Sequence, residues 1–129
     1  ARARDRPEVT RLAGTRQVRT AAITEDDRLE LRVAFADSFY PDPVIAASLS
    51  IRWYTNDDFT IHYRETREAE SWECRWDRHP NPHNTRAHFH PPPDASTPGE
   101  DASYPSDYRD VTSYVLSEIE QRIVTLWNT

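Results

Sequence analysis

Between residues 17 and 77, apolar and polar positions alternate with a period of two, a pattern typical of half-buried β-strands. The alternation is weak over residues 17–23 and clear over residues 29–35, 45–55, 59–64 and 72–77. Polar turns separate these stretches, so consecutive strands should pair as an antiparallel meander. We therefore expect a sheet of four to five strands with one apolar and one polar face.

The spacing becomes helical near the C-terminus. Apolar residues recur at positions 108, 111, 115, 119, 123 and 126, which predicts one amphipathic helix over residues 107–127. Ser106 or Asp107 can cap its start, and Asp110 suits the positive end of the helix dipole. One long helix can cover the apolar face of the meander, so we expect an α+β fold with the helix packed there.

The length of 129 residues suits one domain. We expect a single α+β domain over residues 16–129, preceded by a basic flexible arm or short helix at residues 1–15. The segment 78–105 holds seven of the ten prolines and should form a His/Pro-rich loop. Prolines 91–93 favour extended backbone before them, so residues 86–90 can lie beside the strand at 72–77.

The charge balance is unusual, because all 16 basic residues are arginines against 22 acids, for a net charge of −6. This composition resembles that of proteins from salt-loving archaea, whose cytoplasm screens charges within a few Å. Nucleic acid is therefore not excluded as a partner, since short-range arginine contacts can hold phosphates. The arginine-rich arm either binds a phosphate backbone or an acidic partner, or carries incidental charge.

Cysteine usage and hydropathy bear on the compartment. Cys74 is the only cysteine, so no internal disulfide can form, which fits a reducing compartment. The sequence shows no apolar run of membrane-spanning length and no signal peptide, so we expect a cytoplasmic protein without a membrane partner. Strand parity turns Trp72, Cys74 and Trp76 towards the helix, where Cys74 would act as a small buried hydrophobe.

Four of the five histidines lie within residues 74–93, and strand parity groups some of them with charged residues. Arg75 and Asp77 point away from the helix, and in an extended segment Arg86, His88 and His90 project together. A strand at 86–90 packed beside residues 72–77 would bring His88 and His90 close to Arg75 and Asp77. We expect these groups on an open polar face, which His62 and Arg64 also border.

Metal-free RNA cleavage needs this set of side chains. His88 and His90 would serve as base and acid, because the histidine pKa lies near neutrality. Arg75 would stabilise the phosphorane charge, and Asp77 would orient an imidazole. Arg86, Arg64, His62 and His83 are the expected substrate contacts, Tyr54 or Phe89 could stack a base, and no cofactor is expected.

Three other interpretations stay open at this point. His88 and His90, with Asp77, could instead bind Zn²⁺ or Mn²⁺ in a metal-dependent hydrolase. The polar face and the basic arm could form a binding module without catalysis, for a protein or a nucleic acid. The proline-rich segment could also be a solvated wrap in which Arg75 and Asp77 form an ordinary exposed pair.

The segment from Arg75 onwards resembles the TumE family of toxins from bacterial and archaeal toxin–antitoxin pairs. Residues 75–77 (Arg-Trp-Asp) match the start of the family motif, residues 82–85 resemble its middle, and His88 and His90 match its final His-x-His pair. The chain departs from the motif at Arg78, where the family usually has Asn, and it reaches the helix through a long linker. No Lys lies between or beside the histidines, where many relatives have basic residues. The resemblance implies a toxin with suspected RNA-cleaving activity and two partners, RNA and a cognate antitoxin protein.

Overall fold

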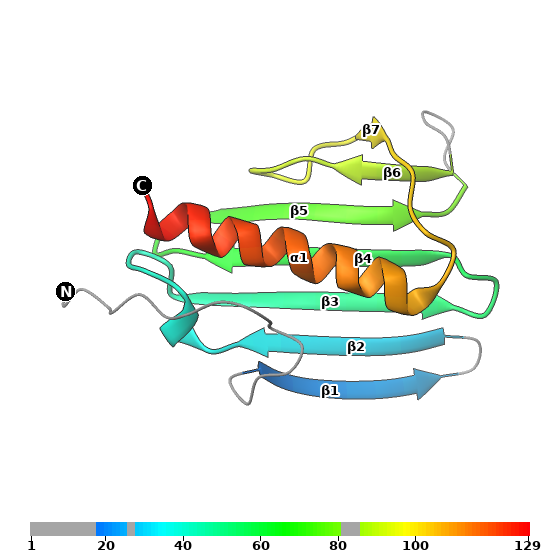
Figure 1. The fold of residues 1–129 in the computed structure, drawn as a ribbon, viewed down its shortest axis with the longest axis horizontal. Coiled ribbons are helices and arrows are strands. Elements are labelled where there is room, and N and C mark those ends of the chain that lie inside the picture. Colours follow the sequence, from blue (N-terminus) through cyan, green and yellow to red (C-terminus); the bar gives the residue numbers. More distant parts are fainter. Residues whose placement is uncertain (1–17, 26–27, 81–85) are drawn as a thin grey trace.

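One antiparallel sheet dominates the computed structural model of the protein, which describes residues 18–25, 28–80 and 86–129. Each strand in it lies beside its neighbour in sequence, in the order β1 to β7 (Figure 1). The strands are β1 (Val18–Glu25), β2 (Arg28–Phe35), β3 (Ala46–Tyr54), β4 (Phe59–Thr66), β5 (Ser71–Arg78), β6 (Ala87–His90) and β7 (Glu100–Asp101). A short 3-10 helix, η1 (Asp37–Phe39), follows β2, and the helix α1 (Tyr108–Trp127) ends the chain.

The predicted α+β class and meander are confirmed, but the sheet is wider than the expected four to five strands. The additional strands β6 and β7 come from the segment 78–105 that was expected to be a loop. Residues 87–90 contain no proline, so every backbone amide among them can donate a hydrogen bond. They therefore pair with β5 over their whole length as a strand. The expected extended segment beside residues 72–77 is thereby confirmed, whereas the expected basic arm at residues 1–15 lies outside the described residues.

The helix α1 covers the apolar face of the sheet, as the sequence pattern predicts (Figure 1). Its buried stripe recurs every four residues, and the members are Val111, Val115, Ile119 and Ile123. The Asp107 side chain caps the first turn by accepting from the Arg109 amide at 2.8 Å. At the C-terminal end of α1, the Trp127 indole donates to the carbonyl of Phe39 in η1 at 2.7 Å. No helix in the described ranges is long and apolar enough to cross a membrane.

A buried ion pair joins β4 to the helix. Glu65 is fully buried, and the Arg122 guanidinium donates to both of its carboxylate oxygens at 2.9 Å. The Tyr63 hydroxyl donates to the same carboxylate at 2.8 Å, and the Arg122 guanidinium lies 3.6 Å from the Trp72 ring centroid. Both oxygens of this carboxylate therefore have hydrogen-bond partners, which a buried charge requires.

Strand parity places the remaining residues of β5 as expected. Cys74 and Trp76 are buried on the helix side, while Asp77 and Arg75 lie on the opposite side. Burial raises the pKa of the Cys74 thiol to about 12, so this thiol stays protonated and is a core residue rather than a nucleophile. Trp72 is partly buried at the margin of the same core. The side of β5 that faces away from α1 is where the chemically active residues gather.

Candidate functional site

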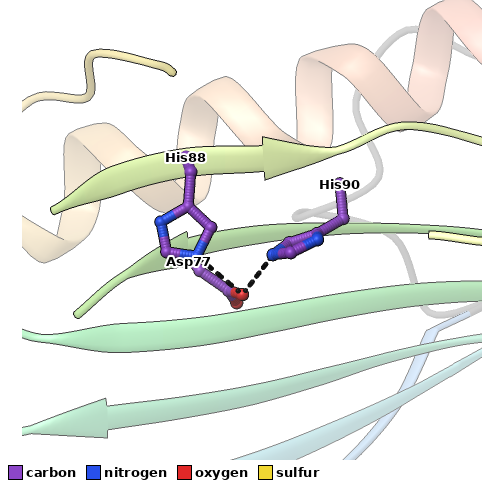
Figure 2. A group of neighbouring side chains, drawn as sticks. All are labelled: Asp77, His88 and His90. Carbon is purple, nitrogen blue, oxygen red and sulfur yellow. Dashed lines mark ion pairs between the residues drawn. The ribbon is translucent and has the colours of Figure 1, made fainter. Parts of the chain in front are cut away.

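The register between β5 and β6 brings the predicted residues together. Asp77 lies opposite His88, and Arg75 lies opposite His90. Residues that face each other in an antiparallel pair project to the same side of the sheet, so all four side chains share one face. Figure 2 shows the two imidazoles of β6 converging on the Asp77 carboxylate of β5.

One oxygen of Asp77 is the centre of this cluster. Its Oδ2 accepts from the Arg75 Nε at 2.8 Å and lies 3.1 Å from the His90 Nε2 and 3.4 Å from the His88 Nε2. A further imidazole, that of His79, has its Nε2 3.5 Å from the same oxygen. Three imidazoles and one guanidinium thus surround a single carboxylate, and we call these five residues the Asp77 centre.

The centre is buried, which corrects the expectation of an open polar face. Asp77 and His88 are 0 % exposed and His90 is 1 % exposed. The chain after β6 turns back over His90: the Ser96 carbonyl accepts from its Nδ1 at 2.9 Å, and Gly99 lies against its ring. A β-carbon on Gly99 would come within 3.0 Å of the His90 ring, so this packing depends on the glycine. The solvent-facing members are His79 and Arg75, whose side chains are 41 % and 33 % exposed.

Hydrogen-bond partners orient the His90 ring. The Ser96 carbonyl is only an acceptor, so Nδ1 carries a hydrogen. The Nε2 on the other side of the ring lies 3.0 Å from the Arg75 Nη2 and 3.1 Å from the Asp77 Oδ2. This nitrogen is thus directed at both Arg75 and Asp77.

His88 is held in a similar way. Its Nδ1 lies 3.3 Å from the Arg86 carbonyl, which leaves Nε2 directed towards Asp77. Burial lowers the pKa of His88, and the nearby imidazoles of His79 and His90 act in the same direction, while the Asp77 charge opposes them. Both imidazoles of β6 therefore direct Nε2 towards the same carboxylate.

The second oxygen of Asp77 is unsatisfied. Its Oδ1 is buried and has no hydrogen-bond partner among the residues that the structure describes. Asp77, His88 and His90 each offer one ligand atom, and these atoms lie within 4.8 Å of one another. Histidines whose other nitrogen is held by a backbone carbonyl are typical metal ligands. These three residues could therefore hold a divalent transition metal, provided that Arg75 turns away from them.

A polar pocket opens beside His79, a residue that sequence reasoning left without a role. The pocket has a volume of about 460 Å³, and its lining residues are Tyr54, Thr55, Asn56, Asp58, Thr60 and His79. The signal for His79 was present in the sequence, because it lies two residues after Asp77. In an extended strand it would project to the same side as Arg75 and Asp77. What hid this signal was the adjacent Pro80, which indicated that the strand had already ended.

The predicted substrate contacts are spread around the centre. The His62 Nε2 lies 2.8 Å from the Glu73 carboxylate and the residue faces Arg75 in the register, while Arg64 is exposed and faces Glu73. The pKa of Glu73 is lowered, because burial, which raises it, is outweighed by hydrogen bonds from Ser71 and His62.

The other predicted contacts lie elsewhere. The Arg86 guanidinium pairs with Asp58 at the rim of the polar pocket, and Tyr54 lines that pocket. Phe89 cannot stack a base on this face, because it projects to the helix side and packs on Trp76 at 5.7 Å between ring centroids. His83 lies outside the described residues.

Comparisons with known proteins give one match. A family model described as Toxin TumE matches residues 8–123, most of the chain. No curated protein and no solved structure matches the chain significantly.

Proposed function

The chain belongs to the TumE toxin family, which makes it a toxin with an antitoxin as partner, and from this premise we propose that it is a metal-independent endoribonuclease. The observation that carries the proposal is the Asp77 centre, in which three imidazoles and a guanidinium surround one buried carboxylate. We also propose the cytoplasm as its place of action, in keeping with the free thiol of Cys74.

The proposed reaction is an attack of the ribose 2′-oxygen on the adjacent phosphorus. The 2′-hydroxyl proton passes to a base, the new O–P bond forms, and the bond from phosphorus to the 5′-oxygen breaks as that oxygen receives a proton from an acid. The products are a 2′,3′-cyclic phosphate and a 5′-hydroxyl. This reaction requires an unprotonated imidazole, a protonated one and a cation at the phosphate.

His90 has the properties of the base. Its Nε2 lies 3.0 Å from the Nη2 of the partly exposed Arg75, which covers it, so movement of that guanidinium onto the substrate phosphate would uncover it. Arg75 would then stabilise the charge that develops on the phosphorane. In this proposal the substrate itself opens the centre, which accounts for a base that is buried in the free protein.

His79 has the properties of the acid. It is the exposed imidazole of the centre, it lies beside the Asp77 carboxylate, and it lines the polar pocket. His88 is completely buried beside Asp77, so in this proposal it positions that carboxylate rather than meeting the substrate. Arg86, at the pocket rim beside Asp58, supplies a further phosphate contact.

The test is cleavage of a fluorescent RNA by the purified toxin with and without EDTA, followed by analysis of the product ends. We expect unchanged cleavage in EDTA and cyclic phosphate ends. His79→Ala should reduce the rate about 10²-fold or more without lowering Tm, because the side chain is exposed. Undiminished cleavage by both His79→Ala and His90→Gln would overturn these roles.

A second candidate function is metal-dependent hydrolysis at the same place, and the unsatisfied Asp77 Oδ1 favours it. The two imidazole nitrogens are 3.1 and 3.4 Å from Asp77 Oδ2. Ligands about 2.0–2.1 Å from a tetrahedral Zn²⁺ lie roughly 3.3 Å apart, so the spacing fits. Cleavage lost in EDTA and restored by Zn²⁺ or Mn²⁺, with one equivalent of metal bound to wild type and none to Asp77→Asn, would replace the first candidate by this one.

A further inference from the structure

We propose that the exposed sheet face of β2 to β5 binds the phosphate backbone of a single-stranded RNA and leads it to the Asp77 centre. This inference rests on the proposed function, because it assigns the surface that would hold the RNA substrate. We call this surface the arginine face, and its arginines are Arg28, Arg32, Arg52, Arg64 and Arg75.

Strand register aligns the face with the centre. Arg32, Ser50, His62, Arg75 and His90 stand opposite one another on five consecutive strands, and so they form one row across the sheet. With strands about 4.8 Å apart, this row is roughly 19 Å long. It begins at an exposed arginine on β2 and ends at the buried His90, so an RNA strand that follows the row arrives at Arg75.

The charge on this face has the opposite sign to that of the whole chain. Its five arginines are accompanied by three acids, Glu30, Glu73 and Asp77, whereas the chain carries a net charge of −6. Each of these acids is already paired on the face: Glu30 with Arg52 at 3.2 Å, Glu73 with His62 at 2.8 Å and Asp77 with Arg75 at 2.8 Å. The arginines in excess give the face its attraction for phosphate.

The type of RNA follows from what the face lacks. In β2 to β5 the one Phe, Tyr or Trp on this side is Tyr54, at the end beside the polar pocket, and it stands outside the row. Proteins that read several single-stranded bases stack them on a series of aromatic side chains, whereas the exposed part of the row offers one imidazole, that of His62. The face therefore suits backbone contacts that tolerate any sequence, with one base accommodated near Tyr54.

An acidic segment of the antitoxin is the other polyanion that could lie on these arginines. RNA is favoured because the row ends at the Asp77 centre, where Arg75 belongs both to the row and to the centre. Binding of an antitoxin requires only that the toxin site be covered. It does not require an arginine next to the residues proposed as base and acid, whereas RNA cleavage does. The experiment below separates the two partners.

The experiment measures binding of a 2′-O-methyl oligonucleotide, which cannot be cleaved for lack of the attacking hydroxyl, by fluorescence anisotropy over a range of salt concentrations. The variant Arg32→Glu/Arg64→Glu reverses two exposed charges on the face. The matched control, Arg109→Glu, reverses an exposed charge at the start of α1. The neutral pair Arg32→Gln/Arg64→Gln guards against misfolding of the reversed pair.

We expect the double reversal to weaken binding at least about tenfold. The slope of log K against log salt should become shallower by about 0.7 for each phosphate that an arginine no longer neutralises. The affinity of the neutral pair should lie between those of wild type and the double reversal. The control should bind within about twofold of wild type. Equal affinity in all four proteins would overturn the inference. So would unchanged RNA affinity combined with abolished antitoxin binding, because the face would then belong to the antitoxin.

The binding experiment tests the arginine face separately from the proposed ribonuclease activity. Wild type that binds the oligonucleotide through these arginines but cleaves no RNA would contradict the proposed ribonuclease and leave the arginine face as an RNA-binding surface. Wild type that cleaves RNA no better than the double reversal would keep the ribonuclease and remove the face.

Discussion

Two carboxylates are completely buried in the part of the chain that the structure describes, those of Glu65 and Asp77, and their surroundings differ. Glu65 receives two bonds from Arg122 and one from the Tyr63 hydroxyl, which engage both of its oxygens. Asp77 has four nitrogen groups on Oδ2 and none on Oδ1 within the described part of the chain. Two equally buried carboxylates thus differ in their hydrogen bonding: both oxygens of Glu65 have partners, whereas among the described residues only one oxygen of Asp77 does.

This difference separates a structural charge from a functional one. The Glu65 network ties the helix to the sheet, and its complete pairing is what a buried ion pair needs to avoid a stability cost. The Asp77 centre crowds three imidazoles and a guanidinium around one oxygen and leaves the other without a partner in the described part of the chain, an arrangement that costs stability. Such local conflicts are typical of sites that act on a ligand.

The largest expected effect is on activity at the Asp77 centre. Asp77→Asn removes the charge that orients the imidazoles while keeping the side-chain volume, so RNA cleavage should fall by about 10²–10⁴-fold. Thermal unfolding should change little, because the partner left behind, Arg75, reaches solvent. A variant that cleaves RNA like wild type would remove the distinction between the two carboxylates.

The largest expected effect on stability is at Glu65. Arg122→Met leaves a fully buried carboxylate with little compensation, so the free energy of unfolding should fall by about 3–5 kcal/mol in urea titrations. The double variant Glu65→Leu/Arg122→Met should recover much of this decrease, since both charges are gone. If the double variant is no more stable than the single one, the loss in Arg122→Met does not come from leaving the Glu65 carboxylate without its cation.

A smaller effect is expected at the glycine beside His90. Gly99 has φ of 86°, and a β-carbon there would come 2.8 Å from the Phe89 carbonyl oxygen and 3.0 Å from the His90 ring. Gly99→Ala should therefore cost about 1–3 kcal/mol in the free energy of unfolding and reduce cleavage by shifting His90. The neighbouring Ser96→Ala keeps the carbonyl that holds His90 and should leave both quantities close to wild type.

The smallest expected effect is a dependence of stability on pH. The pKa of His88 is lowered in the folded protein, so the unfolded chain binds more protons, and stability falls as the pH drops below the ordinary histidine pKa of about 6.5. Tm should decrease between pH 7.5 and 5.5, and His88→Gln should decrease less over the same interval. Parallel curves for the two proteins would show that another group causes the change.

The strands up to residue 78 and the helix were predictable because each leaves a periodic trace in the sequence. The alternation at residues 45–55 and 59–64 corresponds to β3 and β4, and the four-residue recurrence from Val111 to Ile123 corresponds to α1. The short strands β6 and β7 have too few residues to show a period, and each depends on pairing with the strand before it, β6 with β5 and β7 with β6. Local sequence carries no such information about a partner strand.

Four of the five members of the Asp77 centre were predictable from the sequence, whereas His79 and the burial of the centre were not. Parity alone grouped Arg75 and Asp77, and the extended segment before the prolines added His88 and His90. Their enclosure depends on the chain after β6 turning back, through contacts of Ser96 and Gly99 with His90 that no periodicity reveals. The role of Glu65 was missed for the same reason, because its partner Arg122 is 57 residues away.

The pairing of Asp77 with His88 also limits how relatives of this protein can diverge. Antiparallel register fixes which residues face each other and does not fix how many residues connect them. Insertions or deletions between the two strands should accumulate freely, while the spacing of one residue inside each pair, Arg75 with Asp77 and His88 with His90, should be invariant. A search for distant members should therefore combine two rigid tripeptides with a gap of unrestricted length.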